Sequence, residues 1–244
     1  MDFKQQVEAR IKANENDKAL RSSRDAFVKA SMAVQYSYNF TWLGRPIIQY
    51  PQDMVAMQEI LWEVQPDLIV ETGIAHGGSL IFSASMLELI ASCGGPEGEV
   101  LGIDIDIREH NRRAIEQHPL FKRIDMIEGS STSTSVIEQV HDRARGKNRV
   151  LVCLDSDHTQ DHVLAELDAY ASLTTVGSYC VVFDTVIEEL PEDMFPDRPW
   201  STGNNPETAI REFLGKHDEF EVDRRLDNKL QISVARGGYL KRVR

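Results

Sequence analysis

Short segments that are apolar throughout alternate with helix-like segments along most of the chain, and this alternation limits the fold more than any other feature. Five segments are predicted strands, at 68–70, 100–103, 124–127, 150–154 and 179–183. The stretches after the first four have apolar residues at helical spacing, at 80–90, 108–117, 135–144 and 162–170. Strands that are apolar on both faces are typical of a parallel sheet covered by helices on both sides. The sequence therefore predicts an α/β protein with a doubly wound, mostly parallel sheet.

The segments outside this alternation suggest how the chain is organised. Residues 1–33 are polar and helix-friendly, and an aromatic connector over 36–46 follows them, so 1–50 is predicted to be an N-terminal helical arm with its connector. A helix is expected from Pro51 to about Pro66, and residues 51–244 are predicted to form one domain. The proline-rich, acidic segment 184–205 is too long for a simple connection and is predicted to be a lid. A helix at 206–214 and candidate strands at 220–222 and 230–234 complete the chain.

The composition excludes several functions. The 244 residues include 27 Lys and Arg against 39 Asp and Glu, a net charge of -12, which argues against a broad surface for nucleic acid. The longest apolar run, 150–154, is far shorter than the ~20 residues of a membrane span, and the first residues lack the apolar core of a signal peptide. We therefore expect a cytoplasmic protein with no membrane span. The three cysteines lack the spacing of a zinc or redox site and are expected to be ordinary thiols.

Polar residues follow the first three predicted strands, where an open parallel sheet binds its ligands. Glu71 ends the first strand and precedes a glycine-rich turn, Asp104 ends the second, and Ser130 comes soon after the third. A carboxylate at the turn disfavours a pyrophosphate and suits a cationic amino-acid cofactor, and Gly-x-Gly-x-x-Gly is absent, so S-adenosylmethionine fits better than NAD. Asp104 is expected at the ribose hydroxyls and Ser130 near the adenine. The candidate cofactor-binding residues are Glu71, Thr72, Gly73, His76, Gly77, Gly78, Ser79, Asp104, Ser130, Ser131 and Asp155.

Acidic residues follow the fourth and fifth predicted strands. Asp155 and Asp157 come after the fourth strand, and Asp184 comes after the fifth. If these strands are neighbours, the crowded carboxylates predict a divalent cation, with Mg²⁺ favoured because the donors are oxygens. The cation would polarise a substrate hydroxyl, with Asp155 and His158 as the candidate catalytic residues and His158 as the base. The alternative is that the acids only cap the next helix and that His158 lies on the surface.

Five sequence blocks carry a resemblance to a known family. They are the runs at 42–46 (Trp-Leu-Gly-Arg-Pro), 71–79, 154–159, 182–185 and 203–206. In this order they resemble the cephalosporin hydroxylase family, which also contains rhamnosyl O-methyltransferases, and the resemblance runs from about Tyr36 to the C-terminus. It implies a Rossmann-like class I methyltransferase fold, S-adenosylmethionine and Mg²⁺ as cofactors, and a homo-oligomer. The family's metal-binding acids correspond to Asp184 and to one of Asp155 or Asp157, while Phe183 stands where some members have a further acid.

Three functions follow from these observations. The first is transfer of a methyl group from S-adenosylmethionine to a hydroxyl of a sugar or glycosylated natural product, with Phe195 or Trp200 as candidate platforms for the sugar. The second is hydroxylation of a cephalosporin-type β-lactam, which the family name suggests. An iron oxygenase needs two histidines and a carboxylate around an open site, and the predicted strand ends do not offer that set. The third is a subunit that keeps the fold only as a scaffold, which the polar residues at all five strand ends disfavour.

Overall fold

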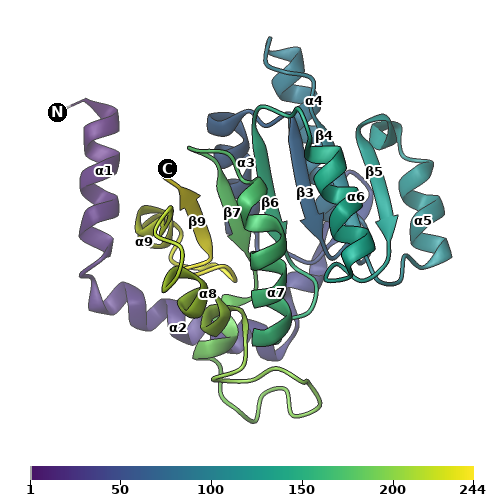
Figure 1. Ribbon diagram of the computed structural model, residues 1–244. Helices are drawn as coiled ribbons and strands as arrows, with labels where there is room; N and C mark the ends of the chain where they lie inside the picture. The colour runs from purple at the N-terminus through teal and green to yellow at the C-terminus, as the bar shows by residue number, and fades with distance from the viewer. Residues whose placement is uncertain (1) are drawn as a thin grey trace.

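A seven-stranded sheet forms the centre of the computed structural model, which describes residues 2–244 (Figure 1). Its strand order is β5-β4-β3-β6-β7-β9-β8. The pairs from β5 to β7 are parallel, whereas β9 pairs antiparallel with both β7 and β8. The predicted mostly parallel α/β sheet is therefore confirmed. The strands are β3 (Leu68–Thr72), β4 (Glu99–Asp104), β5 (Ile124–Glu128), β6 (Val150–Leu154), β7 (Tyr179–Val182), β8 (Phe220–Val222) and β9 (Tyr239–Arg242).

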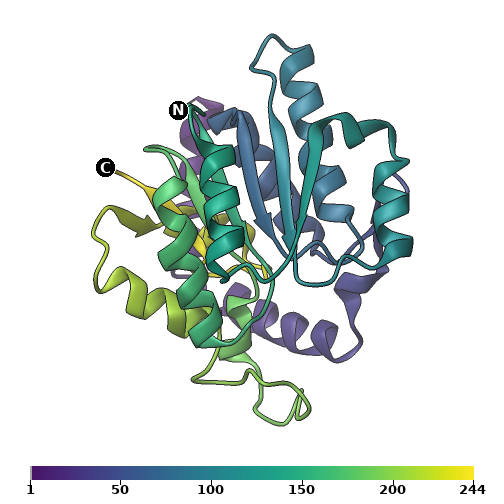
Figure 2. The ribbon, with the colours of Figure 1, turned by 45° about the vertical axis from the view of Figure 1, so that its right-hand side comes forward.

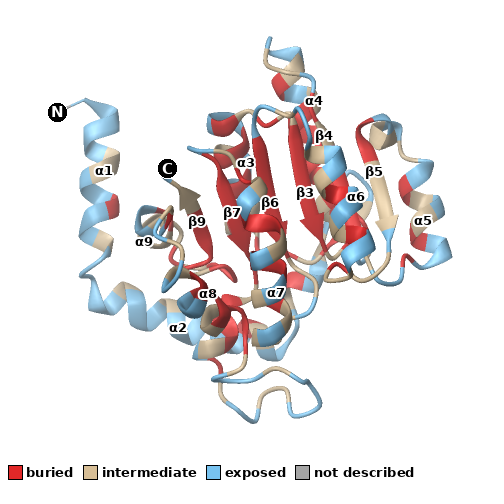
Figure 3. Cartoon of the chain, viewed as in Figure 1, coloured by how far each residue is buried: buried red, intermediate tan, exposed pale blue. Residues whose placement is uncertain are grey.

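Helices cover both faces of the sheet, which explains why the central strands are apolar throughout. All five residues of β3 are buried; Ile69 packs in the apolar cluster of one face, and its neighbours Leu68 and Val70 pack in the cluster of the other (Figure 3). The first face is covered by α3 (Pro51–Val64), α4 (Gly78–Ser92), α5 (Glu109–Glu116) and α9 (Arg224–Leu230). The second face is covered by α6 (Thr134–Ala144), α7 (Gln160–Tyr170) and α8 (Pro206–Leu214).

The C-terminal segment departs from the sequence prediction. The predicted strand at 220–222 is confirmed as β8, but the one predicted at 230–234 is wrong. Helix α9 begins after Asp223, whose carboxylate caps it, and the chain from its end to β9 is irregular. Leu230 ends α9, and Ile232 and Val234 pack against the core from the irregular segment that follows. Gln231 and Ser233 between them are also buried, so the alternation of apolar residues does not mark the two faces of a strand.

The N-terminal arm consists of α1 (Phe3–Asn14) and α2 (Lys18–Ala33), and α2 runs below the carboxyl edge of the sheet (Figures 1 and 2). Glu8 of α1 receives hydrogen bonds from Arg225 of α9, and Ser31 of α2 shares a buried hydrogen bond of 2.7 Å with Tyr50. The hairpin of β1 (Phe40–Trp42) and β2 (Arg45–Ile47) follows. The side chains of Ile47 and Tyr50 belong to the main core, so the predicted domain division at residue 50 stays a prediction.

Within residues 2–244, none of the helices combines the length and the apolar character that crossing a membrane requires.

Candidate functional site

The carboxyl ends of the parallel strands lie level with one another and surround a cavity of about 310 Å³. Thr72 at the end of β3 pairs with Ile103 of β4 on one side and with Leu154 of β6 on the other. Three groups of residues line the cavity: the glycine-rich turn after β3, the polar residues after β6 and β7, and aromatic residues from the N-terminal arm and the loop after β7. The predicted site residues that line it are Gly73, His76, Gly78, Ser79, Asp155, His158 and Asp184.

Two glycines of the turn after β3 permit close approaches that a side chain would prevent. Gly73 has a φ of +89°, and a Cβ there would lie 2.0 Å from the carbonyl oxygen of Asp155. A Cβ on Gly78, the first residue of α4, would lie 2.1 Å from the carbonyl oxygen of Pro46. The turn therefore packs directly on the residue that follows β6, and the hairpin packs directly on the start of α4.

Two polar side chains that the sequence analysis did not select hold the glycine-rich turn. Arg45 donates to the carbonyl oxygen of His76 at 3.0 Å and to the amide oxygen of Asn111 at 3.0 Å. Asn111 in turn donates to the carbonyl oxygen of Ala75 at 2.9 Å. Asp104 accepts a hydrogen bond of 3.2 Å from the amide of Ala75. Arg45 lies within the family-like run at 42–46, whereas the sequence has no local signal for Asn111.

Glu71 lies beneath this turn, and its side chain is buried. It accepts a hydrogen bond from the hydroxyl of Ser79, and burial raises its pKa to about 7. A smaller cavity of about 30 Å³ adjoins Glu71, Ser79 and Asp155, and Gln49 and Asp53 also line it. Burial raises the pKa of Asp53 to about 6, and the amide nitrogen of Gln49 donates to Asp155 at 3.2 Å. The inner part of the site is therefore rich in hydrogen-bond acceptors.

Asp155, His158 and Asp184 form a cluster with the donors of a metal site. One possible ligand atom of each lies within 4.8 Å of the others. Nε2 of His158 is 3.2 Å from Oδ2 of Asp184, a hydrogen-bonding distance. Burial, and then the nearby carboxylate of Asp184, raise the pKa of Asp155 well above its ordinary value. A bound cation would relieve this repulsion, so the two carboxylates fit a divalent metal ion with His158 beside them.

Two neighbouring residues do not join this cluster. Asp157 accepts hydrogen bonds from the backbone amide and the hydroxyl of Thr159, at 2.8 and 2.7 Å. Burial alone would raise the pKa of Asp157, but these hydrogen bonds outweigh it and lower the pKa. Phe183 is buried in the core and has no donor atom for a metal. The assignment of Asp157 as a ligand stays a prediction, while the geometry favours Asp155 and Asp184.

The predicted cofactor residues after β4 and β5 lie away from the cavity lining. The hydroxyl of Ser130 shares a hydrogen bond with that of Thr132. Ser131 is buried and lies 3.2 Å from Nε2 of His162, which also contacts Ser156 at 3.1 Å. Asp104, Ser130, Ser131, Thr72 and Gly77 are not among the residues that line the main cavity. Their roles at a cofactor stay predictions.

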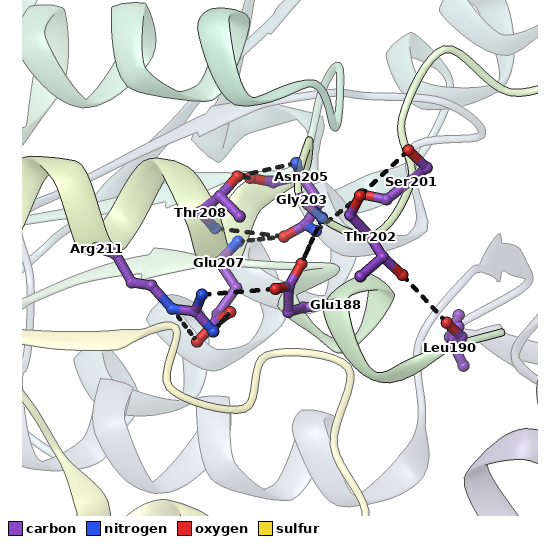
Figure 4. A network of polar contacts seen from close by, with 9 residues as sticks. All are labelled: Glu188, Leu190, Ser201, Thr202, Gly203, Asn205, Glu207, Thr208 and Arg211. Atoms are coloured by element: carbon purple, nitrogen blue, oxygen red, sulfur yellow. Dashed lines mark hydrogen bonds and ion pairs between the residues drawn. The ribbon is translucent and has the colours of Figure 1, made fainter. Parts of the chain in front are cut away.

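The segment predicted as a lid is fastened at its base, while its tip extends past the carboxyl edge of the sheet (Figures 1 and 2). Glu188 accepts hydrogen bonds from the amide of Gly203 at 2.8 Å and from the side chain of Asn205 at 2.6 Å (Figure 4). Asn205 also caps α8. Phe195, Arg198 and Trp200 come from the tip and line the cavity, and the Trp200 ring lies edge-on to those of Phe195 and His158. Of the two aromatic residues selected from the sequence, Trp200 therefore lies beside the candidate base and Phe195 packs against Trp200.

This sheet, with polar groups gathered at the ends of its parallel strands, defines a Rossmann-like protein of the class I methyltransferase fold. The family model described as Rhamnosyl O-methyltransferase/CmcI matches residues 34–243. The chain therefore belongs to the rhamnosyl O-methyltransferase/CmcI family, which confirms the resemblance seen in the sequence.

Named relatives and solved structures agree with this membership. A rhamnosyl O-methyltransferase of Mycobacterium leprae is 33% identical over 210 residues, covering 83% of this chain and 82% of that protein. One from Mycobacterium tuberculosis is 32% identical over 207 residues, covering 83% and 78%. An apo structure of CmcI superposes with a TM-score of 0.60 at 22% identity, covering 85% of this chain and 77% of the other. The mycinamycin-pathway methyltransferase MycE, in complex with Mg, SAH and mycinamycin VI, gives 0.51 at 17% identity, covering 89% and 54%.

Proposed function

We propose that this protein is an S-adenosylmethionine-dependent O-methyltransferase that transfers a methyl group to a hydroxyl of a sugar or glycosylated natural product. The observation that carries the proposal is the main cavity, which brings the glycine-rich turn, the Asp155–His158–Asp184 cluster and two aromatic side chains together. Two mycobacterial relatives are named rhamnosyl O-methyltransferases. A methyl group on a sulfonium is already electrophilic, so the protein needs chiefly to align the hydroxyl and remove its proton.

The glycine-rich turn and Glu71 are proposed to hold the methyl donor. Gly73 and Gly78 let a ligand approach the backbone of the turn closely. The carboxylate of Glu71 would attract the ammonium group of the donor. Asp104, at the end of the neighbouring strand and two residues beyond the partner of Glu71, suits the ribose hydroxyls. Arg45 and Asn111 keep the turn in place.

Asp155 and Asp184 are proposed to hold Mg²⁺, with the acceptor hydroxyl beside them. A bound Mg²⁺ supplies Lewis-acid polarisation, which lowers the pKa of the hydroxyl. His158 contacts both Asp184 and Trp200, so it can take the proton that the hydroxyl loses as the O–CH₃ bond forms. The S–CH₃ bond of the donor breaks in the same step, and S-adenosylhomocysteine leaves. Asp184 fixes the orientation of the imidazole ring.

The acceptor is proposed to be a saccharide that rests on Trp200 and Phe195. Both rings line the cavity, and that of Trp200 lies edge-on to the candidate base. Aromatic faces suit sugar rings because they cover the apolar C–H surface while the hydroxyls stay free to form hydrogen bonds. The loop tip also excludes water from the transfer step.

The structure does not favour the alternative of an iron-dependent hydroxylase. A mononuclear iron oxygenase uses two histidines and a carboxylate. Among residues 2–244, the cluster with metal-site geometry has one histidine and two aspartates.

Methyl transfer is tested with S-adenosylmethionine carrying a labelled methyl group and a panel of rhamnosides, other glycosides and the free sugars. We expect label in a glycoside product, formation of S-adenosylhomocysteine, and loss of both when EDTA removes divalent cations. Oxygen uptake with a β-lactam acceptor, in the absence of methyl transfer, would replace the proposal with the hydroxylase. Two further expectations, a homo-oligomer and a cytoplasmic location, stay predictions; light scattering after size exclusion tests the first and fractionation of cells tests the second.

A further inference from the structure

Gln49 lines both cavities and carries a buried side-chain oxygen with no hydrogen-bond partner. Its side chain is 7% exposed and lines the main cavity as well as the small inner one. The amide nitrogen donates to Oδ2 of Asp155 at 3.2 Å, whereas Oε1 has no partner within the described part of the chain. Buried amide oxygens in folded proteins are almost always hydrogen-bonded. This oxygen therefore points to a ligand group that donates a hydrogen bond.

The side chains around Gln49 indicate the chemistry of that group. The polar residues that share the inner cavity with it are acids and serines, and no Lys or Arg is among the described residues that line it. The oxygens of Asp53 already accept from the amide of Val234 and the hydroxyl of Tyr239. The hydroxyl of Ser79 donates a hydrogen bond to the carboxyl group of Glu71. The other half of the lining residues are apolar. Because most of the polar side chains around Gln49 are acids and none is basic, this lining favours a positively charged donor over a carboxylate or a phosphate.

The size and position of the inner cavity agree with a small cation. Its volume of about 30 Å³ has room for about one water-sized group, and a primary ammonium is of that size. Gln49, Ser79 and Asp155 line both cavities, so a ligand in the larger one can reach the smaller one with a short substituent.

We propose that Gln49 recognises the α-ammonium group of the methyl donor: Oε1 accepts a hydrogen bond from the ammonium while the amide nitrogen holds Asp155. The inference rests on the proposed function and adds to it a residue from the connector before α3, away from the strand ends. Gln49 thereby links the bound donor to one of the two proposed metal-binding carboxylates.

Calorimetry with two ligands separates recognition of the ammonium from recognition of the nucleoside. S-adenosylhomocysteine has the ammonium group, whereas 5′-methylthioadenosine lacks the amino-acid portion. In metal-free buffer, Gln49→Met should weaken binding of S-adenosylhomocysteine about tenfold or more and leave that of 5′-methylthioadenosine within about twofold. The matched control is Gln52→Met: the side-chain oxygen of Gln52 is also buried without a partner, but Gln52 lines neither cavity. We expect this control to bind both ligands like the wild type.

Each of the other outcomes counts against the inference. Equal weakening of both ligands, no weakening, or a loss seen only after Mg²⁺ is added would overturn it and leave the proposed function in place. Failure of the wild type to bind S-adenosylhomocysteine would overturn the proposed function as well. If Gln49→Met does not fold, Gln49→Glu provides the test, because it keeps an oxygen at the same position. That variant should bind S-adenosylhomocysteine at least as tightly as the wild type, and a selective loss of this ligand would overturn the inference.

Discussion

Replacing Glu71 with glutamine should stabilise the cofactor-free protein at alkaline pH. The side chain is 4% exposed, and burial raises its pKa to about 7 from the ordinary 4.5. Because the folded protein holds this proton more tightly than the unfolded chain does, the folded state binds more protons between these two values. The stability that this bound proton contributes to the folded state is fully present below about pH 4.5, and it is lost as the pH rises through about 7.

The size of the effect follows from the two pKa values. Their difference corresponds to about 3 kcal/mol, at about 1.36 kcal/mol for each pH unit. Glutamine does not ionise and keeps an oxygen that can accept the hydrogen bond from Ser79. Glu71→Gln should therefore have a free energy of unfolding up to about 3 kcal/mol higher than the wild type at about pH 8, and the gain should shrink to less than about 1 kcal/mol near pH 5.

Urea unfolding at both pH values measures this difference. The matched control is Glu138→Gln on the exposed side of α6, which should change the free energy of unfolding by less than about 0.5 kcal/mol at either pH. The reasoning is refuted if Glu71→Gln is no more stable than the wild type at about pH 8, or if it gains the same amount at both pH values. The same variant should bind S-adenosylmethionine less tightly, because a carboxylate attracts an ammonium more strongly than an amide does.

Four further substitutions test the site. Asp184→Ala should lower turnover by about a thousandfold or more while calorimetry shows S-adenosylmethionine binding within about threefold of the wild type; full activity in EDTA would remove the metal from the mechanism. His158→Gln should lower kcat by about a hundredfold or more with donor binding unchanged, and a kcat close to that of the wild type would exclude His158 as the base. Trp200→Ala should raise KM for the acceptor about tenfold with no change in donor affinity, and an equal effect on both ligands would contradict a role specific to the sugar. Gly73→Ala should lower the free energy of unfolding by about 3 kcal/mol or more, because its Cβ would lie 2.0 Å from a backbone oxygen; a melting temperature like that of the wild type would contradict the observed packing.

The sheet was predictable from the sequence because strands that are buried on both faces have apolar residues at nearly every position. Every residue of β3 and β6 is buried, so both strands are apolar almost throughout. Strand β9 has no such apolar run, because its last two residues, Lys241 and Arg242, are charged and only partly buried. Residues 230–234 resembled a strand because apolar and polar residues alternate there, although the structure buries polar Gln231 and Ser233 as well as Val234.

The strand-end acids were predictable because parallel topology places the ends of neighbouring strands together. Asp155 and Asp184 follow adjacent strands, and the structure brings them into one cluster. Arg45, Gln49 and Asn111 reach the site from other segments through tertiary packing, which spacing along the chain does not reveal.

The residues that line the main cavity come partly from the carboxyl edge of the sheet and partly from segments outside the sheet. The reacting groups lie on the rigid edge of the sheet, whereas Met32, Tyr38 and the tip with Trp200 reach the cavity from separate parts of the chain. A change in the tip would therefore alter the shape of the acceptor side and leave the strand-end carboxylates in place. Exchanging the tip between relatives is a direct way to retarget such an enzyme.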